Sequence, residues 1–206
     1  MSRTEQDLVG TMAVDADAYY GIHSLRAAEN FSITGRRLPG EMIVSMASIK
    51  KACARANRMA GVLPGRIADA IERACDDLIA GKLHDQFIVD PIQGGAGTST
   101  NMNANEVIAN RAIELLGGKK GDYSLVHPND HVNCGQSTND IYPTCVKMTL
   151  FRACESLLDG LDVLIGALSE RAKAFDGVVK MGRTQLQDAV PIRLGQEFAA
   201  YASVMR

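Results

Sequence analysis

Three runs of the sequence are rich in glycine, hydroxyl and amide groups. They are GGAGTSTNMNANE at 94–106, HPNDHVNCGQSTND at 127–140 and MGRTQLQDAVP at 181–191. Hydroxyl, amide and backbone N–H groups hold a carboxylate by hydrogen bonds without adding a charge of their own. The runs therefore predict a binding site for a small carboxylate, provided that the fold brings them together.

The segment QSTND at 136–140 comes just before the longest helical pattern. A helix N-terminus offers unpaired N–H groups and a partial positive charge. Ser137, Thr138 and Asn139 would add two hydroxyls and an amide at that point. The same residue types are preferred helix caps, so the sequence alone also allows a simple cap.

The other two runs also allow two interpretations, a ligand-binding segment or an ordinary structural one. In GAGTST the glycines allow a ligand to approach the backbone, and Thr98 would donate from its hydroxyl. The run lacks the Gly-Lys-Ser/Thr ending of a phosphate loop, so a plain connecting loop is the alternative. In the third run, Thr184 and Gln185 could donate to a ligand oxygen, whereas Arg183 is expected to pair with Asp188 or the backbone. An ordinary helix start is the alternative there.

The histidines at 127 and 131 flank Pro-Asn-Asp and have no zinc-site spacing with a cysteine pair. A neutral, hydrogen-bonded loop histidine is the default expectation. A secondary anion contact through His127, with Asn129 and Asp130, is the alternative. No metal site is predicted.

Apolar residues at three- and four-residue steps predict the helices that carry these runs. Residues 1–40 look irregular, with one short helix near 24–30. Later helices are expected from Glu41 to Gly61, from Pro64 to Gly81, from a cap at Asn101 or Asn103, and from Tyr142 to Phe175. Glu106 would complete a capping box with Asn103. A last helix is expected from Val190, with Pro191 in its first turn, and it continues to Arg206.

The pattern from 142 to 175 is longer than a typical globular helix of ~10–14 residues. A helix of this length needs neighbours along its whole surface, which predicts a helical bundle. We therefore expect an all-α protein, with a mostly helical domain at 1–138 and the beginning of a bundle domain at 139–206. The chain stops within a helical pattern, which predicts that it is truncated.

Composition excludes several classes of protein. The net charge is -2, which gives no field to attract nucleic acid or an anionic membrane. No apolar run approaches the ~20 residues of a membrane span. The N-terminus lacks the apolar core of a signal peptide. The five cysteines are odd in number and are expected to be reduced thiols in a cytoplasmic protein.

Taken together, the runs resemble the conserved blocks of the aspartase/fumarase superfamily, and the resemblance covers essentially all 206 residues. Within it, the aspartate ammonia-lyase branch is the more similar, because of DAYYGIHSLRAAENF, STND and Gln185. Cys134 departs from the pattern, since it stands where the superfamily usually has Lys. The matching blocks are GTSTNMNANEVIANRAIELLG, HPNDHVN, QSTNDIYPT and KMGRTQLQDAVPIRLGQEF.

The resemblance implies a reversible conversion of L-aspartate to fumarate and ammonia without an organic cofactor, and it leaves room for a divalent metal activator. A base removes a proton beside one carboxylate, which becomes a dianionic aci-carboxylate. By the same resemblance, uncharged donors bind the substrate: Thr98, Ser137, Thr138, Asn139, Thr184 and Gln185.

The superfamily's base is a serine on a loop with the pattern Gly-Ser-Ser-X-Met-Pro-X-Lys-X-Asn-Pro, which this sequence lacks. The resemblance thus implies that the base lies beyond Arg206, that no catalytic residue lies within the chain, and that the chain alone is inactive. It also implies a homotetramer in which each active site takes its blocks from three different chains. The alternatives are a class II fumarase-like enzyme acting on malate and a non-catalytic helical assembly module.

Overall fold

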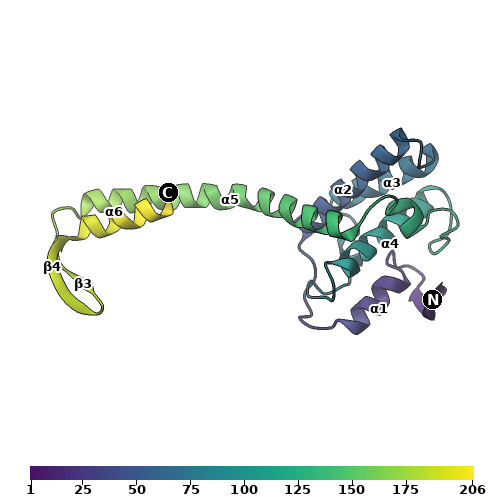
Figure 1. Ribbon diagram of the computed structural model, residues 1–206, viewed down its shortest axis with the longest axis horizontal. Coiled ribbons are helices and arrows are strands. Elements are labelled where there is room, and N and C mark those ends of the chain that lie inside the picture. The colour runs from purple at the N-terminus through teal and green to yellow at the C-terminus, as the bar shows by residue number, and fades with distance from the viewer. The chain divides into compact units, whose positions relative to one another are not determined.

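A computed structural model describes residues 1–206 as two compact units, Met1–Thr149 and Leu150–Arg206. Helices dominate both units, as the sequence predicts (Figure 1). The predicted division between 138 and 139 coincides with the start of α5, whereas the two units divide within that helix. In chain order the elements are β1 (Ser2–Asp7), β2 (Gly10–Asp15), α1 (Ile22–Asn30), α2 (Gly40–Met59), α3 (Gly65–Ile79), the short helix η1 (His84–Gln86), α4 (Thr98–Leu115), the short π-helix η2 (Pro128–Val132), α5 (Thr138–Ala174), β3 (Val179–Thr184), β4 (Gln187–Arg193) and α6 (Leu194–Met205).

The core of the first unit lies between α2, α3 and α4. Met46, Ile71 and Ile108 come from these three helices, and each is at most 1% exposed. Burying one such side chain is worth about 1.5–3 kcal/mol, so the apolar stripes read from the sequence supply the cohesion of this unit. The predicted helices at 41–61 and 64–81 are confirmed, except that Pro64 caps α3 from outside instead of lying in its first turn.

The first forty residues are more ordered than the sequence indicated. β1 and β2 form an antiparallel hairpin in which Ser2 pairs with Asp15. Asp7 Oδ1 accepts hydrogen bonds from the N–H groups of Val9 and Gly10 and so fixes the turn. The short helix predicted near 24–30 is confirmed as α1. The hairpin escaped prediction because its short strands mix polar and apolar residues without a clear alternation.

The predicted start of α4 is wrong. The helix begins at Thr98, after Gly97 in the left-handed region at φ 83°, and both Asn101 and Asn103 lie buried within it. Glu106 makes no capping box with Asn103. Its carboxylate instead accepts hydrogen bonds from residues 21–24 at the N-terminus of α1, where the unpaired N–H groups of that helix need acceptors.

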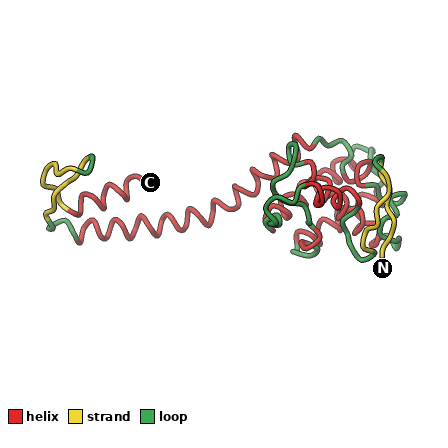
Figure 2. Tube along the Cα trace, turned by 90° about the horizontal axis from the view of Figure 1, so that it is seen from below, coloured by secondary structure: helices red, strands yellow, loops and turns green.

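The second unit contains the later turns of α5, the β3–β4 hairpin and α6 (Figure 2). The helix predicted from Val190 begins only at Leu194, so Pro191 was misplaced. Pro191 lies in β4 opposite Met181. A two-stranded hairpin has only edge strands, and an edge strand tolerates a proline that lacks an N–H donor.

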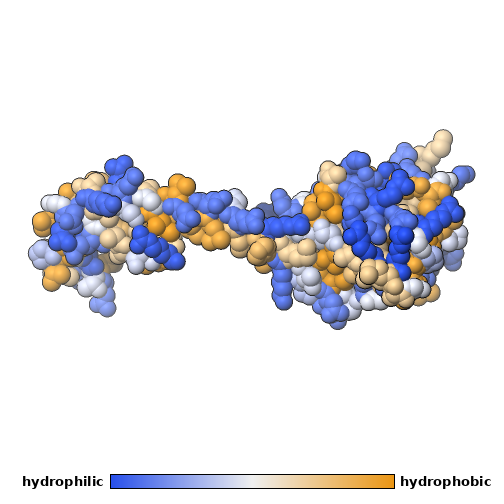
Figure 3. Space-filling model, turned by 90° about the horizontal axis from the view of Figure 1, so that it is seen from above, coloured by the Kyte–Doolittle hydropathy of each residue, from blue (hydrophilic) through white to orange (hydrophobic).

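Large apolar side chains lie on the surface of the second unit (Figure 3). Phe151 is 73% exposed and Val163 is 75% exposed, both on α5. The helical repeat that predicted a buried stripe is present, but nothing within the second unit covers these residues. No helix is long and apolar enough to cross a membrane.

Candidate functional site

The first two polar runs meet within the first unit. Asn101 Nδ2, in the first turns of α4, donates a hydrogen bond of 3.3 Å to Thr138 Oγ1 at the start of α5. Nearby, a Cβ atom added to Gly97 would come within 2.2 Å of the Tyr142 ring. The absence of a side chain at 97 therefore lets the start of α4 pack directly against the start of α5.

The N-terminus of α4 leaves donors free. Thr100 N donates to Gln93 Oε1 at 2.9 Å, and Asn101 N donates to Gly97 O at 3.0 Å. The N–H groups of Thr98 and Ser99 have no acceptor within the chain. Because Thr98 is exposed, its hydroxyl and these two N–H groups are available to an anion at the positive end of the helix.

The start of α5 confirms the helix cap predicted from QSTND, and carboxylate binding there stays a prediction. Ser137 Oγ accepts from Asn139 N at 3.2 Å, so the serine caps the helix. Ser137 and Asn139 are nevertheless exposed, and Thr138 is half-buried. Thr138 Oγ1 accepts from Asn101, which leaves the proton of its own hydroxyl free to be donated to a ligand.

A buried lysine lies beneath this segment. Lys50 on α2 is 0% exposed, and its Nζ donates to Asn133 Oδ1 at 2.8 Å and to Gln136 Oε1 at 2.9 Å. Burial lowers the pKa of Lys50 to about 7, because the charged form loses its hydration. No carboxylate pairs with this ammonium group.

The third run lies in the second unit, in the turn between β3 and β4. Thr184 pairs with Gln187 across the turn, and Gln185 and Leu186 have φ values of 49° and 64°. Two consecutive non-glycine residues in the left-handed region store backbone strain, which is concentrated at functional sites in proteins. The predicted pairing of Arg183 is confirmed, since its Nε lies 3.1 Å from Asp188 Oδ1.

The structure corrects the way in which the runs are shared. The resemblance implied one chain for each run, but the runs at 94–106 and 127–140 come together in a single chain through Asn101 and Thr138. Only the run at 181–191 lies in the other unit.

Comparisons with known proteins show the family of the chain. A family model described as lyase matches residues 10–206. The chain belongs to this lyase family. Aspartate ammonia-lyase of Bacillus subtilis is 55% identical over 98% of this chain and 43% of that protein. Fumarate hydratase class II of Halobacterium salinarum is 54% identical over 97% of this chain and 42% of that protein.

Solved structures of lyases have the same fold. The cobalt-bound fumarate lyase:delta crystallin of Brucella melitensis has a TM-score of 0.93 and 52% identity, over 100% of this chain and 45% of that one. The class II fumarase of Schistosoma mansoni has a TM-score of 0.87 and 38% identity, over 100% of this chain and 43% of that one. The chain thus spans less than half the length of the relatives it matches.

The histidine segment of the chain forms a separate small structure. His127 Nδ1 accepts hydrogen bonds from Asn129 N at 3.2 Å and Asp130 N at 3.1 Å, so the ring caps η2. His131 Nδ1 in turn accepts from His127 N at 2.9 Å. The predicted hydrogen-bonded histidine is thus confirmed for His127. Its Nδ1 is occupied by the two N–H groups of η2.

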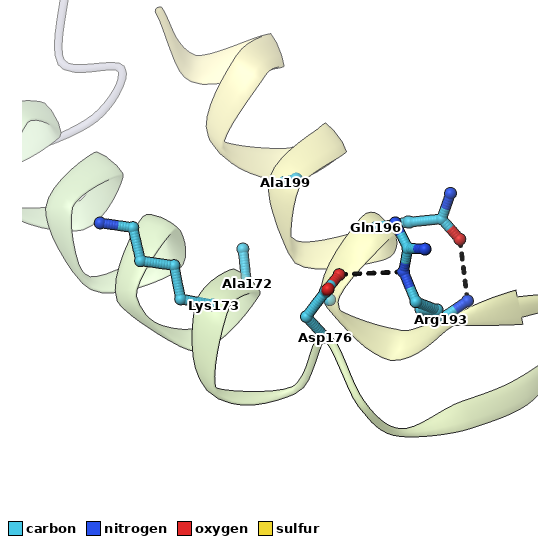
Figure 4. A pocket seen from close by; sticks show the side chains of 7 residues that line it. Ala172, Lys173, Asp176, Arg193, Gln196 and Ala199 are labelled. Atoms are coloured by element: carbon cyan, nitrogen blue, oxygen red, sulfur yellow. Dashed lines mark hydrogen bonds and ion pairs between the residues drawn. The ribbon is translucent and has the colours of Figure 1, made fainter.

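A cavity of about 430 Å³ lies in the second unit between the end of α5 and the start of α6 (Figure 4). Arg193 Nε contacts Asp176 Oδ1 at 2.9 Å, and Arg193 N donates to Gln196 Oε1 at 2.8 Å. These polar groups serve each other, and none of the predicted site residues lines the cavity. The geometry of the polar runs therefore gives the better candidate site.

Sequence reasoning missed the residues that support Thr138. Lys50, Asn101, Asn133 and Gln136 form a connected group, but none was proposed from the sequence. One signal was present: Lys50 follows Met46 by four residues, so a charged side chain occupies the apolar stripe of its helix. A lysine at such a position requires polar partners inside the protein.

Proposed function

We propose that the protein is an aspartate ammonia-lyase, which reversibly converts L-aspartate to fumarate and ammonia. The observation that carries this proposal is the meeting of α4 and α5 at Asn101 and Thr138. It gathers free N–H groups and uncharged hydroxyls at one place, as a dicarboxylate requires. The aspartate ammonia-lyases of several bacteria, at 52–55% identity, support the choice of substrate.

In the proposed reaction, a base takes a proton from the carbon beside one carboxylate of L-aspartate. The electron pair left behind is drawn onto that carboxylate as a dianionic aci-carboxylate. It then forms the carbon–carbon double bond as the carbon–nitrogen bond breaks and ammonia leaves. Donors placed where the second negative charge develops bind the intermediate more tightly than the substrate, which lowers the barrier.

The residues have distinct roles in this proposal. Thr98, Ser137, Thr138 and Asn139 hold the substrate carboxylates, and Thr184 with Gln185 completes the pocket. His127, Asn129 and Asp130 provide a secondary anion contact. The base is not among the residues that we assign. The elimination itself uses no organic cofactor, and a divalent metal ion would act only as an activator.

We also propose a homotetramer that shares its active sites between subunits. The uncovered apolar side chains of α5, including Phe151 and Val163, support this proposal. Exposed apolar area of this kind is costly in water and marks an association surface. The third polar run would then reach the site from another chain.

The alternative function is that of a class II fumarase acting on L-malate, and the Halobacterium relative supports it. A third view is a helical assembly module without activity. The test is to express the complete reading frame and follow fumarate absorbance with L-aspartate and, separately, with L-malate. Fumarate from aspartate supports the proposal, and fumarate from malate alone overturns it. The 206-residue chain assayed alone then shows whether these residues suffice.

A further inference from the structure

We infer that Lys50 is a positioning residue for the carboxylate site: its buried ammonium group holds the turn before Thr138 and supplies the positive charge that the site's own donors lack. This inference rests on the proposed function, since it concerns the same dicarboxylate. It goes beyond that function because Lys50 lies on α2, outside all three polar runs.

The ammonium group organises the turn at 133–136. It binds the side-chain oxygens of Asn133 and Gln136, the two ends of the turn. The turn is closed further by Asn133 Nδ2, which donates to Gln136 O at 3.0 Å, and by Gln136 N, which donates to Asn133 O at 3.1 Å. Removing the ammonium group would leave Gln136 Oε1, which is only partly exposed, without its donor from the protein, so the geometry of this turn depends on Lys50.

A short path connects the lysine to the ligand side. Lys50 Nζ lies 2.8 Å from Asn133 Oδ1, which accepts from Asn101 Nδ2 at 3.0 Å. The same Nδ2 donates to Thr138 Oγ1 at 3.3 Å. Asn101 Oδ1 is buried without a donor, so the network is not complete within the chain. Three contacts therefore separate the buried charge from a hydroxyl that we assign to the substrate.

The charge itself has no counterion. Buried lysines are normally paired with a carboxylate because an isolated charge loses its hydration. Lys50 instead contacts amide oxygens, which solvate the cation but leave its net charge in place. Along this path Thr138 Oγ1 lies no more than ~9 Å from Lys50 Nζ, and an anion one hydrogen bond beyond it would gain roughly tenfold in affinity from the unit charge at an effective dielectric constant of ~20. In this inference, the carboxylate of the ligand acts as the counterion that Lys50 lacks within the protein.

The charge is present only while Lys50 is protonated. The pKa of Lys50 is about 7, and the titratable groups facing it are the thiols of Cys53 on the same helix and Cys75 on α3. Burial raises the pKa of both thiols, so they stay neutral near pH 7. His131 lies on η2, which packs against α2. Its pKa is lowered from the ordinary value of 6.5 by burial, so its charge is lost below the pH range in which Lys50 titrates. Lys50 is therefore the group here that changes charge between pH 7 and 8.

The experiment measures binding of succinate, a dicarboxylate that cannot react, by calorimetry on the complete protein at pH 6 and pH 8.5. In the wild type the affinity should fall about tenfold between these values. Lys50→Met should bind about tenfold more weakly at pH 6 and lose most of the pH dependence. Lys51→Met is the matched control, because Lys51 is on the same helix but pairs with the exposed Asp76, and it should behave as the wild type.

A second measurement needs no folded variant. With lysines labelled at Cε, the titration of Lys50 is followed by NMR with and without succinate. Because coupling is reciprocal, succinate should raise the pKa of Lys50 by about one unit, whereas Lys51 should not shift. An unchanged pKa of Lys50, or wild-type affinity in a folded Lys50→Met protein, overturns the inference. Failure of the wild type to bind succinate and to convert aspartate overturns the proposed function as well. Turnover of aspartate without any effect of Lys50→Met overturns the inference alone.

Discussion

The two units use the same helical periodicity for opposite purposes. In the first unit the stripes of α2, α3 and α4 cover one another, so that Ile71 and Ile108 are 0% exposed. In the second unit the stripe of α5 is open, and Phe151 and Leu157 are 73% and 60% exposed. An apolar repeat therefore predicts that a face will be covered but not which chain covers it. We therefore expect the first unit to be stable by itself and the second to depend on association.

The largest effect is expected in the first core. Ile108→Ala should lower the free energy of unfolding by about 2–5 kcal/mol, because it leaves a cavity among fully buried neighbours. Val163→Ala in the second unit is the control and should change it by less than about 0.5 kcal/mol in the unassembled chain. Denaturant unfolding of dilute protein measures both. Equal losses would show that the two faces do not differ.

A substitution on the exposed face of α5 should weaken association and leave the stability of the first unit unchanged. Phe151→Asp places a charge in the exposed apolar face, so the dissociation constant of the assembly should rise by at least about 100-fold, roughly 2.7 kcal/mol. The unfolding of the first unit should stay the same. Analytical ultracentrifugation over a range of concentrations measures this. An unchanged assembly would remove Phe151 from the association surface.

At the site, Thr138→Val should weaken carboxylate binding or lower kcat/KM by about 10- to 100-fold. Valine has nearly the shape of threonine, so the change removes the hydroxyl donor and little else. Thr138→Ser should retain most of the activity. Thr144→Val is the control, since the Thr144 hydroxyl is exposed and donates to Asp140 O within α5. Full activity of the valine variant at 138 would place the ligand elsewhere.

The buried lysine should make stability depend on pH. The pKa of Lys50 is about 7 in the folded chain and near its ordinary value of 10.5 when unfolded. Between these values the unfolded chain binds the extra proton, so the free energy of unfolding rises with pH, by up to about 1.4 kcal/mol per unit. The window of pH 7–8.5 is best, because the buried Cys75 thiol has the opposite effect once unfolded thiols ionise above about 8.5. Melting temperatures of wild type and Lys50→Met measure this slope, which should disappear in the variant.

The smallest effect concerns the hairpin turn. Leu186→Gly should stabilise the second unit by up to about 1 kcal/mol, because glycine adopts a φ of 64° without strain. Leu186 is 96% exposed, so little packing is lost. Thermal unfolding checks the gain. A loss of stability would show that the leucine makes a contact that outweighs its strain.

The sequence predicted the elements with strong local signals. The repeats at 41–61, 64–81 and 142–175 gave α2, α3 and α5 within a few residues, since amphipathic periodicity is a local property. The start of the last helix was wrongly predicted at Val190, because an apolar run that contains a proline also suits an edge strand. The hairpin at 2–15 was missed for a similar reason, since short strands leave little periodicity to read.

For the site, residue types alone led to Thr98 and Thr138, whose binding role stays a prediction, and they did not reveal the residues that contact Thr138 from distant parts of the chain. Lys50 contacts residues more than eighty positions away, and Glu106 contacts the start of α1 at a similar separation. Such pairings depend on how helices pack, which no local pattern records. The placement of one polar run in a second unit likewise follows from the fold and not from composition.

Gly97 fixes how closely the starts of α4 and α5 approach each other. With the Tyr142 ring already filling the space where a first carbon of a side chain would lie, even alanine would force the two helix ends apart. The spacing between the amides of one helix and the hydroxyl of the other is therefore set by a missing methyl group. In the site that we propose, a dicarboxylate that contacts both helix ends would have to match this spacing, so Gly97 would limit the length of the ligand without touching it.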